Sequence, residues 1–165
     1  GLENPEAEAD LDWVVGLITA IRSLRSEMNV PPAAKITMFL RDASSVEAKR
    51  LQDFNLLIRT LARLEKAEIS ASADDAKGAA QSVFGTATIL LPLAGVIDVA
   101  KESERLNKEK AKLEKEIASL AGRLSNEGFI AKAPANVVEE QKARLAEAKE
   151  AAVKVEEALK RLKDL

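Results

Sequence analysis

Five basic residues in the second half of the chain share a spacing that could bind phosphate groups. They follow one another at intervals of four, three, four and three residues: Lys101, Arg105, Lys108, Lys112 and Lys115. In an α-helix these intervals place all five on one face, and we call this set the basic stripe. A row of cations facing solvent could follow the phosphate backbone of a nucleic acid. The same row could serve only solubility, with Glu104 and Lys108 as an ordinary i,i+4 ion pair.

Composition excludes several other kinds of chemistry. The chain of 165 residues has no histidine and no cysteine, which rules out the usual zinc sites, thiol nucleophiles, disulfides and histidine bases. Asp74 and Asp75 are adjacent carboxylates in a polar segment that we interpret as a solvated turn. No phosphate-binding loop or dinucleotide fingerprint occurs. We therefore expect no catalytic residue, no metal site and no cofactor in this chain.

Charge and hydropathy bound the environment of the protein. The net charge is −2, so bulk charge alone does not indicate a nucleic-acid-binding protein. No apolar run approaches the roughly 20 residues of a membrane span, and we see no signal peptide. The missing cysteine suits a cytoplasmic protein, and the start at Gly1 suggests an excised fragment. We expect a cytoplasmic monomer without a membrane partner.

Residues 98–165 are predicted to form an antiparallel two-helix coiled coil that carries the basic stripe. Apolar or small residues recur at alternating intervals of three and four on both sides of a break, which is the spacing of a coiled-coil seam. Folding the chain back pairs the following residues: Leu124 with Val138, Ile117 with Leu145, Leu113 with Ala148, and Leu106 with Val155. On the flanks, Glu116 can then meet Arg144 and Glu114 can meet Lys149. At 1.5 Å per residue the arm would reach roughly 40 Å.

The break between the two helices has its own signals. Gly128 stands where a helix C-terminus favours a left-handed residue, and Pro134 stops a continuous helix. Asn136 and Glu139 predict a capping box that opens the second helix. Phe129 lies in this turn, where it could plug the end of the hairpin or stack on a base.

Two further sections precede the arm, which gives an α+β fold class overall. Residues 1–32 predict a helix from about Pro5 to Met28 with Asn4 as its N-cap. Its wide apolar stripe has few partners in the following residues, so we interpret it as the last helix of a larger helical bundle, with residues 1–12 frayed. Residues 33–97 predict a small β-α-β-β connector: a strand at 35–40, one helix, a strand at 66–71, a flexible connection and a third strand at 82–92 that Gly85 interrupts. A capping box of Ser44 and Glu47 opens the helix. Its predicted buried apolar stripe consists of Leu51, Phe54, Leu57, Ile58, Leu61 and Leu64.

Three motifs resemble valyl-tRNA synthetases, and they occur in that family's order. Residues 21–32 (IRSLRSEMNVPP) are similar to the end of its anticodon-binding helical domain. Residues 93–98 (LAGVID) and 104–109 (ERLNKE) resemble the entry to its C-terminal coiled coil. Residues 126–139 (NEGFIAKAPANVVE) are similar to the turn of that coiled coil. The first motif occurs in leucine and isoleucine enzymes too, whereas the arm motifs point to valine.

The resemblance implies a C-terminal piece of an enzyme that attaches valine to its tRNA using ATP. Its coiled coil would contact the outer corner of the tRNA, and the partners would be this tRNA and the remainder of the synthetase. The chain has no HIGH or KMSKS signature, so it would not aminoacylate by itself. By matching position, Arg22, Arg25 and Asn29 fall in the anticodon-domain motif, and Arg105, Lys108, Phe129 and Lys132 fall in the arm motifs.

Two alternatives stay open at this stage. Arg22 and Arg25 could contact RNA or make ion pairs on the helix surface. The whole coiled coil could instead be a protein-interaction arm with no RNA role, and salt-dependent tRNA binding would separate the two functions.

Overall fold

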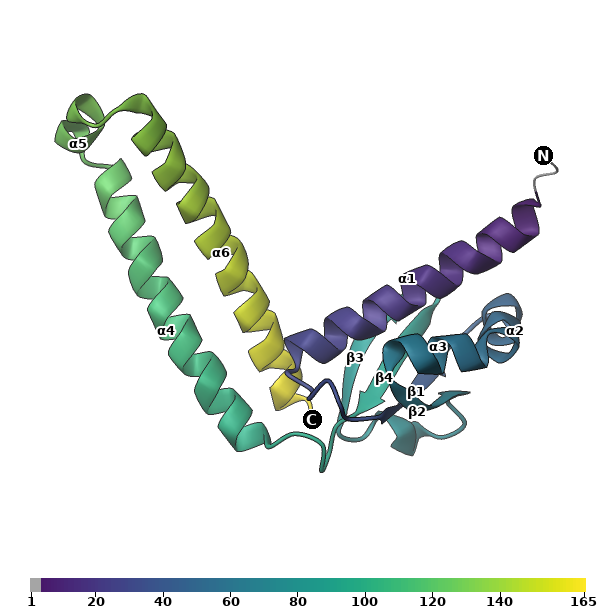
Figure 1. Ribbon diagram of the computed structural model, residues 1–165. Coiled ribbons are helices and arrows are strands. Elements are labelled where there is room, and N and C mark those ends of the chain that lie inside the picture. The colour runs from purple at the N-terminus through teal and green to yellow at the C-terminus, as the bar shows by residue number, and fades with distance from the viewer. Residues whose placement is uncertain (1–3) are drawn as a thin grey trace. The chain divides into compact units, whose positions relative to one another are not determined.

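The structure, a computed structural model, describes residues 4–165 and divides into two compact units (Figure 1). One unit contains the described residues through Asp98 together with Arg161–Leu165, and the other contains Val99–Lys160. The first unit combines a four-stranded sheet with helices, and the second is a pair of long antiparallel helices. The predicted α+β class is confirmed.

Helix α1 (Pro5–Glu27) begins where its cap residues predict. Asn4 is the N-cap and its side-chain oxygen accepts a hydrogen bond from the amide of Ala7 at 3.2 Å. Residues 5–12 are helical, so the expected fraying is wrong there, and residues 1–3 lie outside the described part of the chain. The acidic residues of this first section favour the helix, because carboxylates near its N-terminus complement the helix dipole. Asp10 also pairs with Arg50 at 2.8 Å.

The apolar face of α1 has partners within this chain, contrary to our expectation. The side chains buried along it are Val14, Leu17, Ile18, Ile21 and Leu24, and α1 packs against α2, α3 and β3. Trp13 contacts Phe84 of β3 with ring centroids 5.8 Å apart. The sequence pattern missed these neighbours because they come from elements that are distant along the chain. Whether α1 also belongs to a larger bundle stays a prediction.

Four strands form one mixed sheet: β1 (Ile36–Arg41), β2 (Leu64–Ile69), β3 (Ala79–Phe84) and β4 (Ala87–Pro92). Their order is β2-β1-β4-β3, with β1 parallel to β2 and both other pairs antiparallel. Alternate residues of β1 are buried, which is the signature of a strand covered on one face. Figure 1 shows α1 and α3 lying over the same face of the sheet.

The predicted third strand is in fact a hairpin of β3 and β4, so the β-α-β-β pattern misses one strand. A two-residue loop, Gly85 and Thr86, joins the strands. Gly85 has a φ of +61°, and a Cβ at this position would lie 2.7 Å from a carboxylate oxygen of Glu47. Only glycine meets both demands without strain, and glycine at the first position of a two-residue loop is a hairpin signal.

The predicted single helix after β1 is two helices, α2 (Ser45–Asp53) and α3 (Asn55–Ala62). The predicted capping box is confirmed, because Ser44 and Glu47 exchange side-chain and backbone hydrogen bonds. The helices separate at Phe54, and the side chain of Asn55 donates a 2.7 Å hydrogen bond to the carbonyl of Ala67 in β2. Because the axis changes here, the predicted continuous apolar stripe does not form. Ile58 is buried, whereas Leu57 and Leu61 are exposed.

The predicted flexible connection before β3 is a capped turn, η1 (Ala73–Ala76). The carboxylate of Asp75 accepts hydrogen bonds from the Ser70 hydroxyl at 2.9 Å and from two backbone amides. Asp74 pairs with Lys77 at 3.0 Å. These carboxylates hold a turn together, in agreement with the turn that we expected there.

The second unit is built from α4 (Val99–Leu124), a short α5 (Glu127–Lys132) and most of α6 (Ala135–Lys163). Figure 1 shows α4 and α6 running antiparallel, with α5 at the tip between them. None of the helices within residues 4–165 is long and apolar enough to cross a membrane.

Candidate nucleic-acid interface

The seam between α4 and α6 fixes which way the basic stripe faces. The buried residues of the two helices include the following: Leu106 and Leu120 on α4, and Gln141, Ala148, Val155 and Ala158 on α6. All of these positions except Ala158 lie on the predicted three-and-four rhythm. Ala158 is buried one residue before the predicted position, Leu159, which is half-buried. Lys101, Arg105, Lys108, Lys112 and Lys115 all belong to the exposed class. The basic stripe therefore lies on the solvent side of α4, as the spacing predicts.

Carboxylates on the same helix neutralise part of the basic stripe. Arg105 donates hydrogen bonds to Glu102 at 2.6 Å and to Glu109 at 3.2 Å. The bond to Glu102 is the main reason that the pKa of Arg105 is raised. Lys108 pairs with Glu104 at 3.2 Å, as the i,i+4 spacing suggests. The pairs with Glu109 and Glu104 are exposed, whereas Glu102 is buried. Exposed pairs contribute only about 0–1 kcal/mol, so a phosphate could compete for the cations in these two pairs.

Lys112 and Lys115 are the most available cations of the stripe. Both are exposed, and neither makes an ion pair with another described residue. They lie near the middle of α4, between the neutralised Arg105 and the tip of the arm.

Ion pairs across the seam agree in part with the predicted register. Glu116 lies 3.9 Å from Arg144, as predicted. The predicted pair of Glu114 and Lys149 is not among the ion pairs of residues 4–165. Instead Lys110 pairs with Glu156 at 2.5 Å, and the hydrogen bond that Lys110 donates to Glu156 is the largest cause of the raised pKa of Lys110.

The tip of the arm differs from the sequence prediction. Asn126 does not end a helix: its side chain accepts hydrogen bonds from the amides of Gly128 and Phe129, at 3.0 and 3.3 Å, and so starts α5. Gly128 is therefore helical, and the left-handed cap expected there is wrong. Helix α6 begins at Ala135, because the carbonyl of Pro134 accepts hydrogen bonds from the amides of Val137 at 3.0 Å and Val138 at 3.2 Å.

Asn136 consequently lies inside the first turn of α6, so the predicted capping box with Glu139 is wrong. Phe129 is half-buried and Lys132 is exposed at the tip. Ile130 next to them is 45% exposed. The tip therefore presents a cation beside apolar side chains.

Arg25 is buried, and its guanidinium is held by backbone carbonyls. It donates to the carbonyls of Arg63 at 2.9 Å and Ala62 at 3.4 Å, which end α3. Its other edge donates to Pro31 at 3.1 Å and Ala34 at 2.7 Å, in the loop before β1. Neither alternative that we left open, an RNA contact or a surface ion pair, describes this arrangement. Arg25 ties α1, the loop and α3 together.

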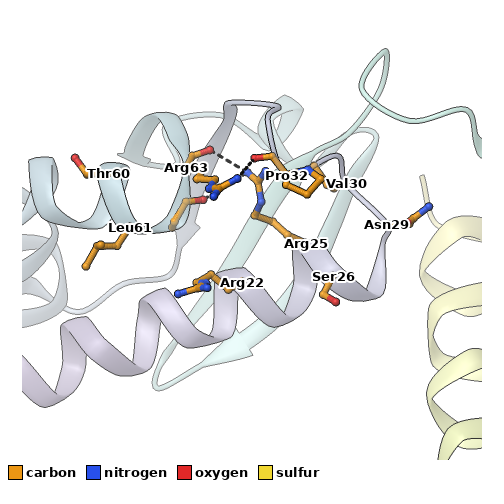
Figure 2. Close-up of a pocket in the computed structure, with 10 residues that line it drawn as sticks. Arg22, Arg25, Ser26, Asn29, Val30, Pro32, Thr60, Leu61 and Arg63 are labelled. Atoms are coloured by element: carbon orange, nitrogen blue, oxygen red, sulfur yellow. Dashed lines mark hydrogen bonds between the residues drawn. The ribbon is translucent and has the colours of Figure 1, made fainter.

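Arg22 and Asn29 lie on the surface beside Arg25. Both are exposed, and Asn29 follows α1 with a φ of +53°. With Arg25 and Arg63 they line a hollow of about 590 Å³ between the end of α1 and the end of α3. Figure 2 shows the side chains of Arg22 from α1 and of Thr60 and Leu61 from α3 around this hollow.

Comparison with known proteins gives the arm a family. Residues 98–163 match the family described as "Valyl tRNA synthetase tRNA binding arm". Over 98% of its length the chain is 47% identical to a valine–tRNA ligase of Mesorhizobium japonicum and 43% identical to one of Brucella suis. Over 96% of its length it is 36% identical to a valine–tRNA ligase of Acinetobacter baylyi. The chain belongs to the valine–tRNA ligase family.

Within that family the chain corresponds to the C-terminal region, arm included. It spans only 17%, 18% and 16% of the lengths of these three ligases. The arm match contains the basic stripe, Phe129 and Lys132. The hollow around Arg22 lies outside it, in the part of the chain that only the whole-chain relatives match.

Sequence reasoning missed Arg63, the cation on the α3 side of the hollow. Arg63 ends α3 with a φ of +54° and donates a 2.7 Å hydrogen bond to the carbonyl of Pro32. A basic residue in the last turn of a helix is too common to single out. Its place opposite Arg22 becomes visible only when α3 packs on α1.

Proposed function

We propose that this chain is the tRNA-binding part of a valine–tRNA ligase. The arm contacts the outer corner of a valine tRNA, far from the acceptor end, and so raises affinity and orients the tRNA. The chemistry, which joins valine to tRNA with ATP, belongs to the remainder of the synthetase. The chain supplies neither a catalytic residue nor a cofactor site of its own.

One observation carries the proposal. The segment that matches a tRNA-binding arm presents, on its solvent face, exposed lysines without ion-pair partners among the described residues, Lys112 and Lys115. Each ammonium that binds a phosphate releases condensed counterions, which favours binding at moderate salt. Arg105 and Lys108 add to this face when a phosphate displaces their carboxylate partners. Lys101 extends it toward the start of α4.

The tip provides a second proposed contact. Lys132 is exposed and can reach a phosphate, whereas half-buried Phe129 supports the packing of α5. We assign Phe129 to the structure of the tip and Lys132 to the RNA.

The division into sections completes the proposal. Residues 1–32 end the anticodon-binding bundle, residues 33–97 form the connector, and residues 98–165 form the arm. The chain acts as a monomer in the cytoplasm, attached to the rest of the enzyme.

The test is a titration of a fluorescent valine tRNA transcript with this chain at several salt concentrations. Replacing both Lys112 and Lys115 with glutamine should weaken binding and reduce the salt slope by up to about 0.9 for each lost contact. The matched control replaces Lys149 and Lys154 of α6 with glutamine, which removes the same charge away from the stripe. The control should bind as the unaltered chain does.

The opposite outcomes are equally clear. If both double variants bind tRNA with unchanged affinity and slope, the basic stripe is not the interface. If the unaltered chain shows no salt-dependent tRNA binding at all, the arm is better explained as a protein-interaction arm with no RNA role.

A further inference from the structure

The hollow between α1 and α3 gathers three guanidinium groups without a carboxylate. Arg22, Arg25 and Arg63 line it, and none of its lining residues is acidic. Within residues 4–165, neither Arg22 nor Arg63 makes an ion pair. Other arginines of this unit have acidic partners, as Arg50 has with Asp10 and Arg161 has with Glu27, whereas Arg59 bonds the side-chain amide of Asn55. The hollow therefore carries a local positive charge that the fold does not neutralise.

A hydrogen bond between two of these arginines holds them in place although their charges repel each other. The buried guanidinium of Arg25 binds the carbonyl of Arg63 at 2.9 Å, which secures the left-handed backbone of that residue. Residues other than glycine rarely adopt this conformation. Burial, and then the nearby charge of Arg63, lower the pKa of Arg25. An anion between the arginines would relieve this repulsion.

The lining also suits the rest of a nucleotide. Its volume of about 590 Å³ falls in the range of roughly 300–1,000 Å³ that is typical of small-ligand sites. The hydroxyls of Ser26 and Thr60 offer hydrogen bonds, and Leu61, which is 49% exposed, offers an apolar surface. Arginine binds phosphate through two parallel N–H groups. Arg63 uses one N–H on Pro32, which leaves others for a ligand.

We propose that this hollow is a second RNA-binding site, in which Arg22 and Arg63 clamp one phosphodiester group and Leu61 supports the adjoining nucleotide. The proposal rests on the proposed tRNA-binding function and adds a contact on the sheet unit. Arg25 acts as a positioning residue, because its own donors are engaged with carbonyls. Arg63 is the residue that makes the site specific to this fold.

The experiment compares three single variants of this chain: Arg22→Gln, Arg63→Gln and, as control, Arg59→Gln. Arg59 lies on α3 and bonds the side chain of Asn55, so its replacement removes the same charge outside the hollow. At about 0.1 M salt, Arg22→Gln and Arg63→Gln should each weaken tRNA binding several-fold and lower the salt slope by about 0.7 to 0.9. Arg59→Gln should leave both unchanged. Thermal unfolding of each variant checks that the fold is retained.

A second titration, with adenosine monophosphate in place of tRNA, separates the possible sources of the phosphate. Amide NMR signals of residues around Arg22 and Arg63 should move only weakly, because one free nucleotide lacks the neighbouring backbone contacts. Saturable binding of the mononucleotide that Arg63→Gln abolishes, together with tRNA affinity that the same variant leaves unchanged, would assign the hollow to a free nucleotide and overturn the RNA proposal.

The two proposals fail in different ways. If replacing Lys112 and Lys115 weakens tRNA binding while Arg22→Gln and Arg63→Gln do not, the arm function stands and the hollow is not a site. If only the hollow variants weaken binding, the hollow stands and the arm function fails. The proposal that the hollow binds RNA is contradicted if Arg59→Gln weakens tRNA binding as much as the hollow variants do. It is also contradicted if the unaltered chain does not bind tRNA.

Discussion

Arg105 on the arm and Arg25 in the sheet unit are both held by several hydrogen bonds, yet their surroundings differ completely. Arg105 lies on the outer face of one helix and bonds carboxylates three and four residues away. Arg25 is buried and bonds four carbonyls that belong to two segments outside α1. The first arrangement follows from helical periodicity alone, and the second exists only once the elements have packed.

The difference separates cations that can change partners from cations that build the fold. A carboxylate on an exposed helix face binds weakly and can yield to a phosphate. A buried guanidinium that satisfies backbone carbonyls cannot leave without exposing unpaired polar groups. Replacing an arginine with glutamine should therefore weaken RNA binding but hardly change stability when the arginine is Arg105. The same replacement should strongly lower stability when the arginine is Arg25.

Replacing Arg25 with glutamine is the strongest test of that contrast. Four carbonyls lose their donor, and the sheet unit should lose about 4 kcal/mol of unfolding free energy. Urea unfolding followed by the fluorescence of Trp13, the single tryptophan of the chain, measures this loss. Arg105→Gln is the matched control on the arm. Its unfolding, followed by circular dichroism of the arm helices, should show a loss of less than about 1 kcal/mol. Equal losses in the two variants would contradict the contrast.

Leu120→Asp tests whether the arm has its own core. Leu120 is 3% exposed in the seam, so a carboxylate there should destabilise the arm by about 3 kcal/mol. Circular dichroism should lose helical signal at temperatures where the unaltered arm is folded. The urea midpoint of the sheet unit, measured by the fluorescence of Trp13, should not change. Retained arm helicity in the variant would show that the seam is wrongly assigned.

Glu47 makes the stability of the sheet unit depend on pH. Burial raises the pKa of this carboxyl, but hydrogen bonds from Thr86, Ser44 and Trp13 outweigh burial and lower the pKa overall. A folded pKa below the unfolded one means that the stabilisation is present above the unfolded pKa. It is lost as the pH falls through the folded pKa.

Glu47→Gln should therefore cost about 2 kcal/mol at pH 7. The difference from the unaltered chain should vanish as the carboxyl becomes protonated. Urea unfolding of both proteins from pH 7 down to pH 3 measures the two curves. A constant difference across this range would mean that the charge of Glu47 contributes nothing.

Local signals in the sequence predicted most of the arm and the starts of several helices. The three-and-four rhythm placed Leu106 and Leu120 in the seam and turned the basic stripe outward. The caps at Asn4 and Ser44 were predicted because each depends on residues within one turn. The ion pair of Glu116 and Arg144 followed from the register of the hairpin.

Features that depend on distant segments were missed. The hairpin turn at Gly85 was taken for an interruption of one strand, although its tight approach to Glu47 requires glycine. The tip was misassigned because Asn126 can end one helix or start another, and only the chain path decides which. Arg63 carries no local signal, because its role depends on α3 lying beside α1.

The central claim is that the outer face of α4 binds tRNA, and amide NMR of this chain during titration with a valine tRNA transcript tests it most directly. We predict that the largest changes lie on α4 around Lys112 and Lys115, with a second set at the tip near Lys132. Raising the salt concentration should reverse them, because phosphate contacts weaken with salt. Changes confined to α6, or a spectrum that tRNA leaves unaltered, would contradict the claim.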